Sequence, residues 1–306
     1  MTGNPERKLK KPGFFSKYGA TYCLLLPWLS LFVFFVVIPI LCAVVISFTD
    51  FDMVRTPHFV GLRNYLTLLL DDETFTKSLS NTLFYAVVTG PAGYIISYIV
   101  AWLINEVQSK FWRSVLTFVF YSPALAGSAF MLWTFIFSGD SYGLLNSLMV
   151  NLGFLSKPVQ WLTDPQYNSY VVVVVILWSS MGVGFLSFVA GFKQLNSELF
   201  EAGAIDGVTN RWQELWYITL PQMVPQLRTG AVLSISGAFA VGGVNAALTG
   251  NPSTDYSTHT ILLHLTDFGY SKYEMGYASA IAVILFVMML GSWILINTVL
   301  KRLSSD

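Results

Sequence analysis

A polar stretch over residues 193–228 carries the clearest set of side chains able to engage another protein. It reads KQLNSELFEAGAIDGVTNRWQELWYITLPQMVPQLR. Asn196 or Ser197 can cap a short helix, because each side chain accepts a hydrogen bond from a free backbone N–H group. Glu198 and Glu201 follow near the start of that helix, where negative charge is favoured. The spacing predicts a short helix that is either a plug for a groove on a partner or an ordinary interfacial helix.

The same stretch also carries signals for where this helix ends. Gly207 is well placed to terminate it, because glycine readily adopts the left-handed conformation that closes many helices. Trp212 and Trp216 are typical interfacial anchors, and they predict a second, interfacial piece. Pro221 and Pro225 then break the chain before the next apolar segment.

Residues for catalysis are missing from the apolar parts of the chain. The long uncharged stretches hold no Asp, Glu, Lys or Arg to serve as a base or carry a coupling ion. His58, His259 and His264 are expected at surface or interface positions rather than as ligands. No G-x-x-x-x-G-K-[ST] loop occurs, and two cysteines cannot build a zinc site. We therefore expect no catalytic residue, metal or cofactor, so any pumping must be powered by a partner.

Small polar residues inside two apolar stretches are the remaining candidates for ligand contact. One stretch carries Trp178, Ser179, Ser180 and Gly182, and the other carries Ser234, Ser236, Gly237 and Asn245. Hydroxyl groups and an aromatic ring suit hydrogen bonding and stacking with a small polar solute in a preformed pocket. Small residues in membrane helices also serve close helix packing. Both interpretations stay open on the sequence alone.

Composition identifies the elements that position these residues. The chain has 306 residues, of which 54% are hydrophobic and only 11% are charged, against roughly 25% charged in ordinary soluble domains. Its 17 basic and 17 acidic residues cancel, so no basic field points to nucleic acid. This composition predicts a polytopic membrane protein.

Six uncharged windows lie between short clusters of charge. Each is long enough to cross a membrane, because a helix needs roughly 20 apolar residues for the hydrocarbon core. Alternating segments of about ten residues, as in a barrel, are not seen. We therefore predict an all-α integral membrane protein with six transmembrane helices. The windows are Tyr18–Thr49, Ser78–Asn105, Ser114–Gly139, Pro165–Phe192, Thr229–Thr254 and Met275–Leu300.

Lys and Arg are unevenly shared between the two sides of this arrangement. Loops rich in Lys and Arg remain cytoplasmic, so both termini are expected inside the cell. The richer side holds Arg7, Lys8, Lys10, Lys11, Lys17, Lys110, Arg113, Lys193, Arg211, Arg228, Lys301 and Arg302, and the poorer side holds Arg55, Arg63, Lys77, Lys157 and Lys272. The first window is too long for a removable signal peptide. Asp50, Asp52, Asp71, Asp72 and Glu73 make the first outer loop acidic. We expect them to be solvated, with docking of a partner protein as the alternative.

The cytoplasmic stretch resembles a known motif. Glu201-Ala202-Gly203-Ala204-Ile205-Asp206-Gly207, followed by Ile218-Thr219-Leu220-Pro221, is similar to the EAA loop in membrane subunits of binding-protein-dependent ABC importers. Gly203 departs from the usual alanine and should loosen the helix by roughly 1 kcal/mol.

Similar matches extend over nearly the whole chain, from about residue 20 to residue 300. Together they resemble the six-helix permease subunits of the carbohydrate branch. They are Phe59-Val60-Gly61-Leu62 with Asn64-Tyr65, Asn81-Thr82-Leu83, the spaced Pro123, Trp133, Gly143 and Asn146, Leu248-Thr249-Gly250, and Gly276-Tyr277-Ala278-Ser279-Ala280.

The resemblance implies a type I importer fold, with a core of five helices preceded by one peripheral N-terminal helix. It implies a second permease subunit that pairs with this one as a heterodimer, two ABC ATPase subunits and an extracellular solute-binding protein. ATP hydrolysis would belong to the ATPase subunits. The coupling helix would rest in a groove of one ATPase, through Leu199, Glu201, Ala202, Gly203, Asp206 and Gly207.

The resemblance also implies where a sugar would pass. In related sugar permeases the contacts follow the tryptophan of the fourth helix and lie 13 to 20 residues after the Leu-Pro pair. Here these positions hold Trp178, Ser179, Ser180 and Gly182, and Ser234, Gly237, Ala238 and Val241. Maltose importers carry asparagine at the last two positions. Alanine and valine there imply another sugar, or a cavity that passes its substrate with little retention.

The interpretation that best fits these features is a permease subunit of a sugar or oligosaccharide importer in the cell membrane. One alternative is the same fold carrying a peptide or a polyol-phosphate, and another is a scaffold or sensor subunit that transports nothing. We expect a cytoplasmic basic tail over 1–17, a peripheral transmembrane helix over 18–49, an extracellular loop over 50–77, a permease core over 78–300 with its coupling loop over 193–228, and a cytoplasmic tail over 301–306.

Overall fold

The computed structural model describes residues 14–127 and 130–303 and is helical throughout its regular elements. Most of the two predicted tails, 1–13 and 304–306, therefore lies outside the described residues. Three helical segments are each long and apolar enough to cross a membrane: Tyr22–Ile46, Glu73–Glu106 and Met275–Thr298. Three bent helix pairs meet the same criterion together, which gives up to six spans. The six predicted windows coincide with these segments.

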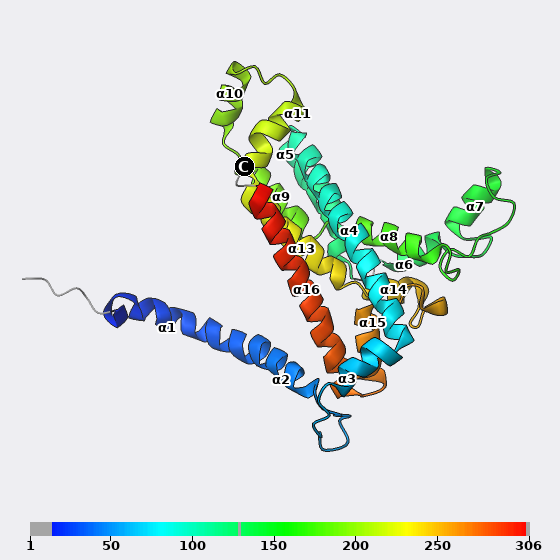
Figure 1. The fold of residues 1–306 in the computed structure, drawn as a ribbon. Helices are drawn as coiled ribbons and strands as arrows, with labels where there is room; N and C mark the ends of the chain where they lie inside the picture. The colour runs from blue at the N-terminus through cyan, green and yellow to red at the C-terminus, as the bar shows by residue number, and fades with distance from the viewer. Residues whose placement is uncertain (1–13, 128–129, 304–306) are drawn as a thin grey trace, which may run out of the picture.

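The first window forms α1 (Phe14–Phe32), the π-helical turn η1 (Val33–Val37) and α2 (Ile38–Ile46). This segment projects away from the remaining helices, and α2 packs against α16 (Figure 1). Its apolar side chains are exposed, Leu24 by 82% and Phe35 by 68%. Lipid can cover such a helix, because its backbone groups are all paired internally.

The central helix of the structure is α4 (Glu73–Glu106), which packs against α8 (Asn168–Ser179), α9 (Val183–Phe192) and α13 (Val224–Phe239). At one end Tyr98 and Ile104 lie in a buried cluster with Phe188 of α9. Nearer the other end Phe75 packs with Ile281 of α16 (Met275–Leu303). The packing of α4 thus joins the two buried clusters into one helical core.

Three of the six windows form bent helix pairs rather than continuous helices. The bend is 40° between α8 and α9, and 43° between α13 and α14 (Gly243–Thr249). Gly182 and Gly242 stand at these breaks with backbone angles outside the helical region. Glycine tolerates such angles at little cost, so the bends have a local cause in the sequence. The third pair is α5 (Lys110–Leu125) with α6 (Phe130–Ile136).

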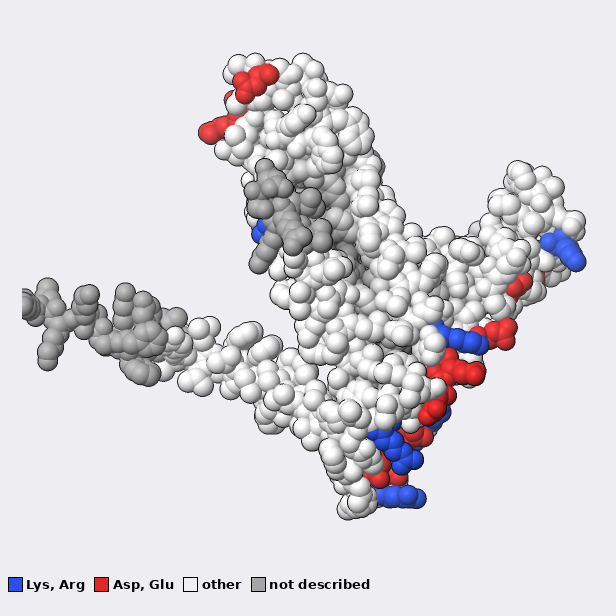
Figure 2. All heavy atoms as spheres, in the orientation of Figure 1, with Lys and Arg blue, Asp and Glu red and all other residues white. Residues whose placement is uncertain are grey.

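Short elements close the two ends of the helical core. One end holds α3 (Arg63–Leu66), η2 (Thr67–Asp71), α7 (Leu144–Asn151), η4 (Thr254–Tyr256), α15 (Ile261–Thr266) and η5 (Asp267–Ser271). The opposite end holds α10 (Ser197–Ile205), α11 (Arg211–Glu214), η3 (Leu215–Thr219) and α12 (Leu220–Gln222). Charged side chains gather at these two ends and leave an uncharged middle on the face in view (Figure 2), as a membrane-spanning core requires.

Candidate functional site

The predicted exposed helix is α10, and its two ends form as the sequence predicts. Asn196 caps it, with its side-chain oxygen accepting a hydrogen bond from the backbone N–H of Glu198 at 3.0 Å. At the other end Gly207 adopts a left-handed conformation, φ +93°, and Val208 N–H donates to the carbonyl of Gly203 at 2.9 Å. This is the Schellman arrangement, which satisfies carbonyls that the helix leaves free.

Most of α10 is exposed at one extremity of the molecule (Figure 1). Glu201, Ala202 and Asp206 are exposed. Leu199 and Ile205 are large apolar residues, yet they are exposed by 47% and 87%. Large apolar side chains left exposed on a short helix can contribute to a protein contact surface.

Gly203 is the half-buried member of the predicted set. A Cβ atom at this position would lie 2.5 Å from Cδ1 of Ile218. The departure from alanine in the motif therefore has a packing reason, because Ile218 fills the space that an alanine methyl group would need.

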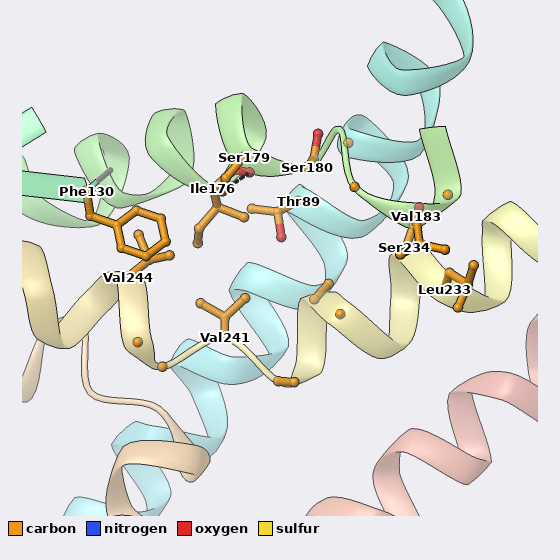
Figure 3. A pocket seen from close by; sticks show the side chains of 18 residues that line it. Thr89, Phe130, Ile176, Ser179, Ser180, Val183, Leu233, Ser234, Val241 and Val244 are labelled. Carbon is orange, nitrogen blue, oxygen red and sulfur yellow. Dashed lines mark hydrogen bonds between the residues drawn. The ribbon is translucent and has the colours of Figure 1, made fainter. Parts of the chain in front are cut away.

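A cavity of about 470 Å³ lies between the bent helix pairs and α4 (Figure 3). Seven of the eight predicted substrate-path residues line it: Ser179, Ser180, Gly182, Ser234, Gly237, Ala238 and Val241. Positions far apart in sequence are thus brought to one space. The breaks after α8 and α13 both open onto it, since Gly182, Gly242 and Gly243 also line its wall.

Trp178 is the predicted residue that does not line the cavity. Its ring packs edge-to-face against Trp133, with ring centroids 5.3 Å apart. Trp178 therefore supports the wall from behind rather than facing the space. Asn245, for which the sequence allowed either a site or a structural role, is fully buried and donates to the carbonyl of Thr258 at 2.7 Å, so it fastens an outer loop.

The cavity wall includes residues that the sequence did not single out. Thr89 and Gly93 come from α4, and Phe130 comes from α6. The four-residue spacing of Thr89 and Gly93 places them on one helix face. That spacing was a usable signal, but small residues in a membrane helix usually indicate packing.

Most hydroxyl protons at the cavity wall are already engaged. Thr89 donates to the carbonyl of Tyr85 at 2.7 Å, and Ser180 donates to that of Leu177 at 2.7 Å. Ser179 donates to carbonyls of the preceding turn in the same way. Within the described part of the chain, Ser234 has no side-chain hydrogen bond and keeps its hydroxyl available. The remaining wall is mainly glycine, alanine and valine, which gives a smooth surface with few fixed polar contacts.

A buried polar cluster joins the N-terminal ends of α4 and α16 to α15. Asp72 caps α4, with one carboxylate oxygen accepting from Phe75 N–H at 2.8 Å. Its other oxygen lies 3.0 Å from Nε2 of His264 and accepts from the Tyr277 hydroxyl at 2.8 Å. The sequence expectation that Asp72 is solvated and His264 lies at a surface or interface is wrong, because the side chains of His264 and Asp72 are only 3% and 14% exposed. His259, 2% exposed, is likewise buried.

Burial sets the protonation of this cluster. It lowers the pKa of His264 despite the opposing charge of Asp72. Burial of Asp72 opposes its ionisation, but the hydrogen bonds from Phe75 and Tyr277 outweigh it and lower its pKa. A neutral His264 thus donates Nε2–H to an ionised Asp72. Burial, reinforced by His264, lowers the pKa of His259 to about 4.

The buried His259 predicts that acid destabilises the subunit. An unfolded histidine titrates near pH 6.5, whereas His259 titrates near pH 4 when folded. The unfolded chain therefore binds more protons in this range, so the contribution is complete above about pH 6.5 and is lost as the pH falls toward 4. Its full size is about 3 kcal/mol.

Thermal unfolding midpoints between pH 7.5 and pH 5 test this expectation. The midpoint of the parent protein should fall with the pH, and His259→Phe, which keeps an aromatic ring but cannot titrate, should show a shallower fall. His58→Phe is the matched control, because the His58 side chain is 72% exposed and should leave the slope unchanged. Equal slopes for His259→Phe and the parent would contradict the assignment.

The broken membrane helices around a central cavity, with an exposed loop helix at one end, define a transport permease. The chain matches the family described as "Binding-protein-dependent transport system inner membrane component" over residues 93–305. It belongs to this family and is a permease subunit of the inner membrane, with several membrane passes and without catalytic activity of its own.

Individual relatives cover nearly the full chain. It is 28% identical over 296 residues to the "Probable ABC transporter permease protein YesP" of Bacillus subtilis, covering 94% of this chain and 93% of that protein. It is 30% identical over 279 residues to the "Arabinooligosaccharides transport system permease protein AraP" of the same organism, covering 90% and 87%.

Solved structures share the fold. One chain of a bacterial ABC transporter involved in the import of the acidic polysaccharide alginate superimposes with a TM-score of 0.77. Its sequence is 23% identical, and the match covers 94% of this chain and 97% of that chain. The expected type I importer architecture is thereby confirmed.

Proposed function

We propose that this chain is the membrane-spanning permease subunit of an ATP-driven importer for a neutral sugar or oligosaccharide. The cavity that gathers seven residues from two broken membrane helices carries the proposal. A relative that is 30% identical over most of both chains is named for arabinooligosaccharide transport. This chain would form one half of the pathway, with a second permease subunit as the other half.

The composition of the cavity wall favours an uncharged solute. Residues lining the cavity include no Lys, Arg, Asp or Glu within the described chain. A polyol-phosphate or a peptide carries charges, and a buried charge needs a partner in the wall. Sugar hydroxyl groups can instead pair with Ser234 and with the free lone pairs of Ser179 and Ser180.

Coupling to ATP is assigned to α10. Its exposed apolar residues, Leu199 and Ile205, would enter a groove on an ATPase subunit, and Glu201 would make the charged contact at the rim. Closure of two ATPases on ATP would draw two such helices together and turn the cavity from inward-facing to outward-facing. An extracellular binding protein would then release the sugar into it.

The sidedness follows from charge. Taken together, the loops and tails on the side that holds α10 carry more Lys and Arg than those on the other side, and the richer side stays in the cytoplasm. The C-terminal end of α16 lies at the same end of the molecule as α10 and α11 (Figure 1), so a cytoplasmic α10 places the C-terminus inside as well. Six crossings then place the N-terminus on the same side.

ATP-dependent uptake in proteoliposomes tests the proposal. The chain is reconstituted with its second permease, its ATPase and the binding protein, and a labelled oligosaccharide is supplied outside. Accumulation that is lost in Glu201→Ala, together with sugar-stimulated ATP hydrolysis, supports both roles. Hydrolysis that needs Glu201 without sugar movement would exclude the sugar but keep the coupling role. No response of either kind would leave a membrane scaffold as the function.

Narrowing the cavity is predicted to slow uptake without disturbing the fold. A Cβ atom at Gly237 meets no atom within 4 Å, so Gly237→Leu places its side chain in open space. Uptake should fall about tenfold or more, as expected when a pocket loses the room for a substrate group. Gly237→Ala is the matched control and should stay near the parent rate. Equal uptake by the leucine and parent proteins would remove this cavity from the pathway.

A further inference from the structure

The coupling helix α10 has few attachments to the membrane core. None of its residues is fully buried, and its main packing partner is η3. Any displacement of α10 must therefore pass through a small number of contacts. Two of these contacts can be assigned to single side chains.

The first contact joins the middle of α10 to η3. Ile218 is 9% exposed, and its Cδ1 occupies the space beside Gly203. A Cβ atom on residue 203 would lie 2.5 Å from Cδ1 but 3.7 Å from Cγ1. Only the terminal methyl group of Ile218 would therefore clash with a side chain at residue 203. This methyl group packs into the space left by the missing side chain of Gly203.

The second contact joins the start of α10 to α12. The side-chain oxygen of Gln222 accepts a hydrogen bond from the backbone N–H of Asn196 at 3.0 Å. Asn196 is the cap of α10, so this bond holds the helix at its first residue. Leu195, just before it, packs against the buried cluster that contains Leu215 and Met223.

Both contacts connect α10 to the segment that continues into α13. Ile218 and Gln222 are four residues apart, and α13 begins two residues after Gln222. Ser234 and Gly237 of α13 line the cavity. Two further contacts join α11 to α4 rather than α10 to α13: Trp212 packs on Trp102 with ring centroids 5.4 Å apart, and Arg211 lies 3.5 Å from Glu106, both side chains being partly exposed, at 66% and 35%. An exposed ion pair of this kind contributes little.

We propose that Ile218 and Gln222 are positioning residues that transmit movement of α10 to α13, and so to the cavity wall. This inference rests on the proposed function, because it assigns the path by which coupling reaches the transport cavity. Gly203 belongs to the same contact, because its lack of a side chain allows Ile218 to pack against α10.

Two loss-of-contact variants test the proposal in the reconstituted transporter. Ile218→Ala removes the packing methyl group, and Gln222→Met removes the acceptor while keeping the length of the side chain. Both should keep assembly and basal ATP hydrolysis, while sugar transported per ATP falls about fivefold or more, as for loss of a typical coupling free energy. Gln222→Glu keeps the accepting oxygen and should retain coupling. Tyr217→Ala, at a side chain that is 70% exposed, is the truncation control and should also retain it.

A suppressor pair provides a second test that does not leave the void created by Ile218→Ala. Gly203→Ala should lower the transport per ATP because its methyl group displaces Ile218, although alanine favours the helix. Ile218→Val deletes Cδ1, so the double variant should recover coupling above the Gly203→Ala level. Unchanged coupling in both Ile218→Ala and Gln222→Met, or no recovery in the double variant, would overturn the inference. A parent transporter without sugar-stimulated ATP hydrolysis would instead overturn the proposed function, which keeps the two failures distinct.

Discussion

Replacing Gly276 with alanine is expected to lower the thermal unfolding midpoint of the subunit by about 5 °C or more. Gly276 begins α16 where the chain passes against the end of the first membrane segment. A Cβ atom there would overlap the carbonyl oxygen of Thr49 and lie 3.0 Å from its carbonyl carbon. The N–H of Gly276 also donates to the carbonyl of Phe51 at 2.8 Å. Because the obstacle is backbone and not a flexible side chain, the two segments must separate.

A control for this substitution exists on the same helix. A methyl group on Gly291 of α16 would meet no atom within 4 Å, so Gly291→Ala gains helix propensity of about 1 kcal/mol without a clash. Its midpoint should equal or exceed that of the parent. Fluorescence-detected unfolding of the two purified variants in one detergent makes the comparison. A midpoint for Gly276→Ala as high as that for Gly291→Ala would show that the two segments are not held at this contact.

Local sequence signals predicted the parts of this protein that depend on neighbouring residues. The charge-free windows coincide with the membrane segments, because span length depends only on consecutive apolar residues. The limits of α10 are also local, since Asn196 and Gly207 act on backbone groups within a turn. The coupling residues themselves remain predictions, although their exposure agrees with a docking role.

The candidate cavity was predictable in part. Ser179 and Ser234 were found from their distances to Trp178 and Pro221, which the resemblance supplies. The broken helices were missed, because an apolar run containing Gly182 or Gly242 reads the same whether the glycine serves packing or a bend. Trp178 does not line the cavity, because its ring packs against Trp133, and either orientation of the ring fits the same sequence pattern. Its place in the substrate path stays a prediction.

Long-range pairing lay beyond what local patterns could predict. Asp72 and His264 are 192 residues apart, and the charge pattern of the first outer loop made a solvated Asp72 the natural expectation. Gly203 similarly looked like a weakened copy of the motif. Gly203 meets Ile218 only because the chain reverses direction at Gly207. The sequence distance between the two residues does not predict that contact.

Replacing Asn146 with leucine is expected to unfold the segment 138–164 locally and to destabilise the subunit by about 3 kcal/mol. Asn146 is fully buried at the start of α7. Its amide nitrogen donates to the carbonyls of Ser138, Asp140 and Val159 at 3.0, 3.2 and 3.0 Å. Its oxygen accepts from the N–H of Val159 at 3.0 Å and from the Trp161 indole at 2.8 Å. Leucine has nearly the same shape but leaves the Ser138 carbonyl, the Val159 N–H and the Trp161 indole without their partner, while the carbonyls of Asp140 and Val159 keep bonds from Gly143 and Trp161 N–H.

The loss of structure in Asn146→Leu should be confined to residues 138–164 if the hydrogen bonds of Asn146 hold this segment together. Hydrogen exchange at the amide of Val159 should become faster in Asn146→Leu, while amides of α4 should keep their protection. Asn151→Leu is the matched control, because Asn151 is exposed and makes one long side-chain bond of 3.4 Å to Ser147. Its exchange pattern should match that of the parent. Unchanged protection of Val159 in Asn146→Leu would mean that packing of Trp161 and its neighbours, rather than the five hydrogen bonds, holds the segment together.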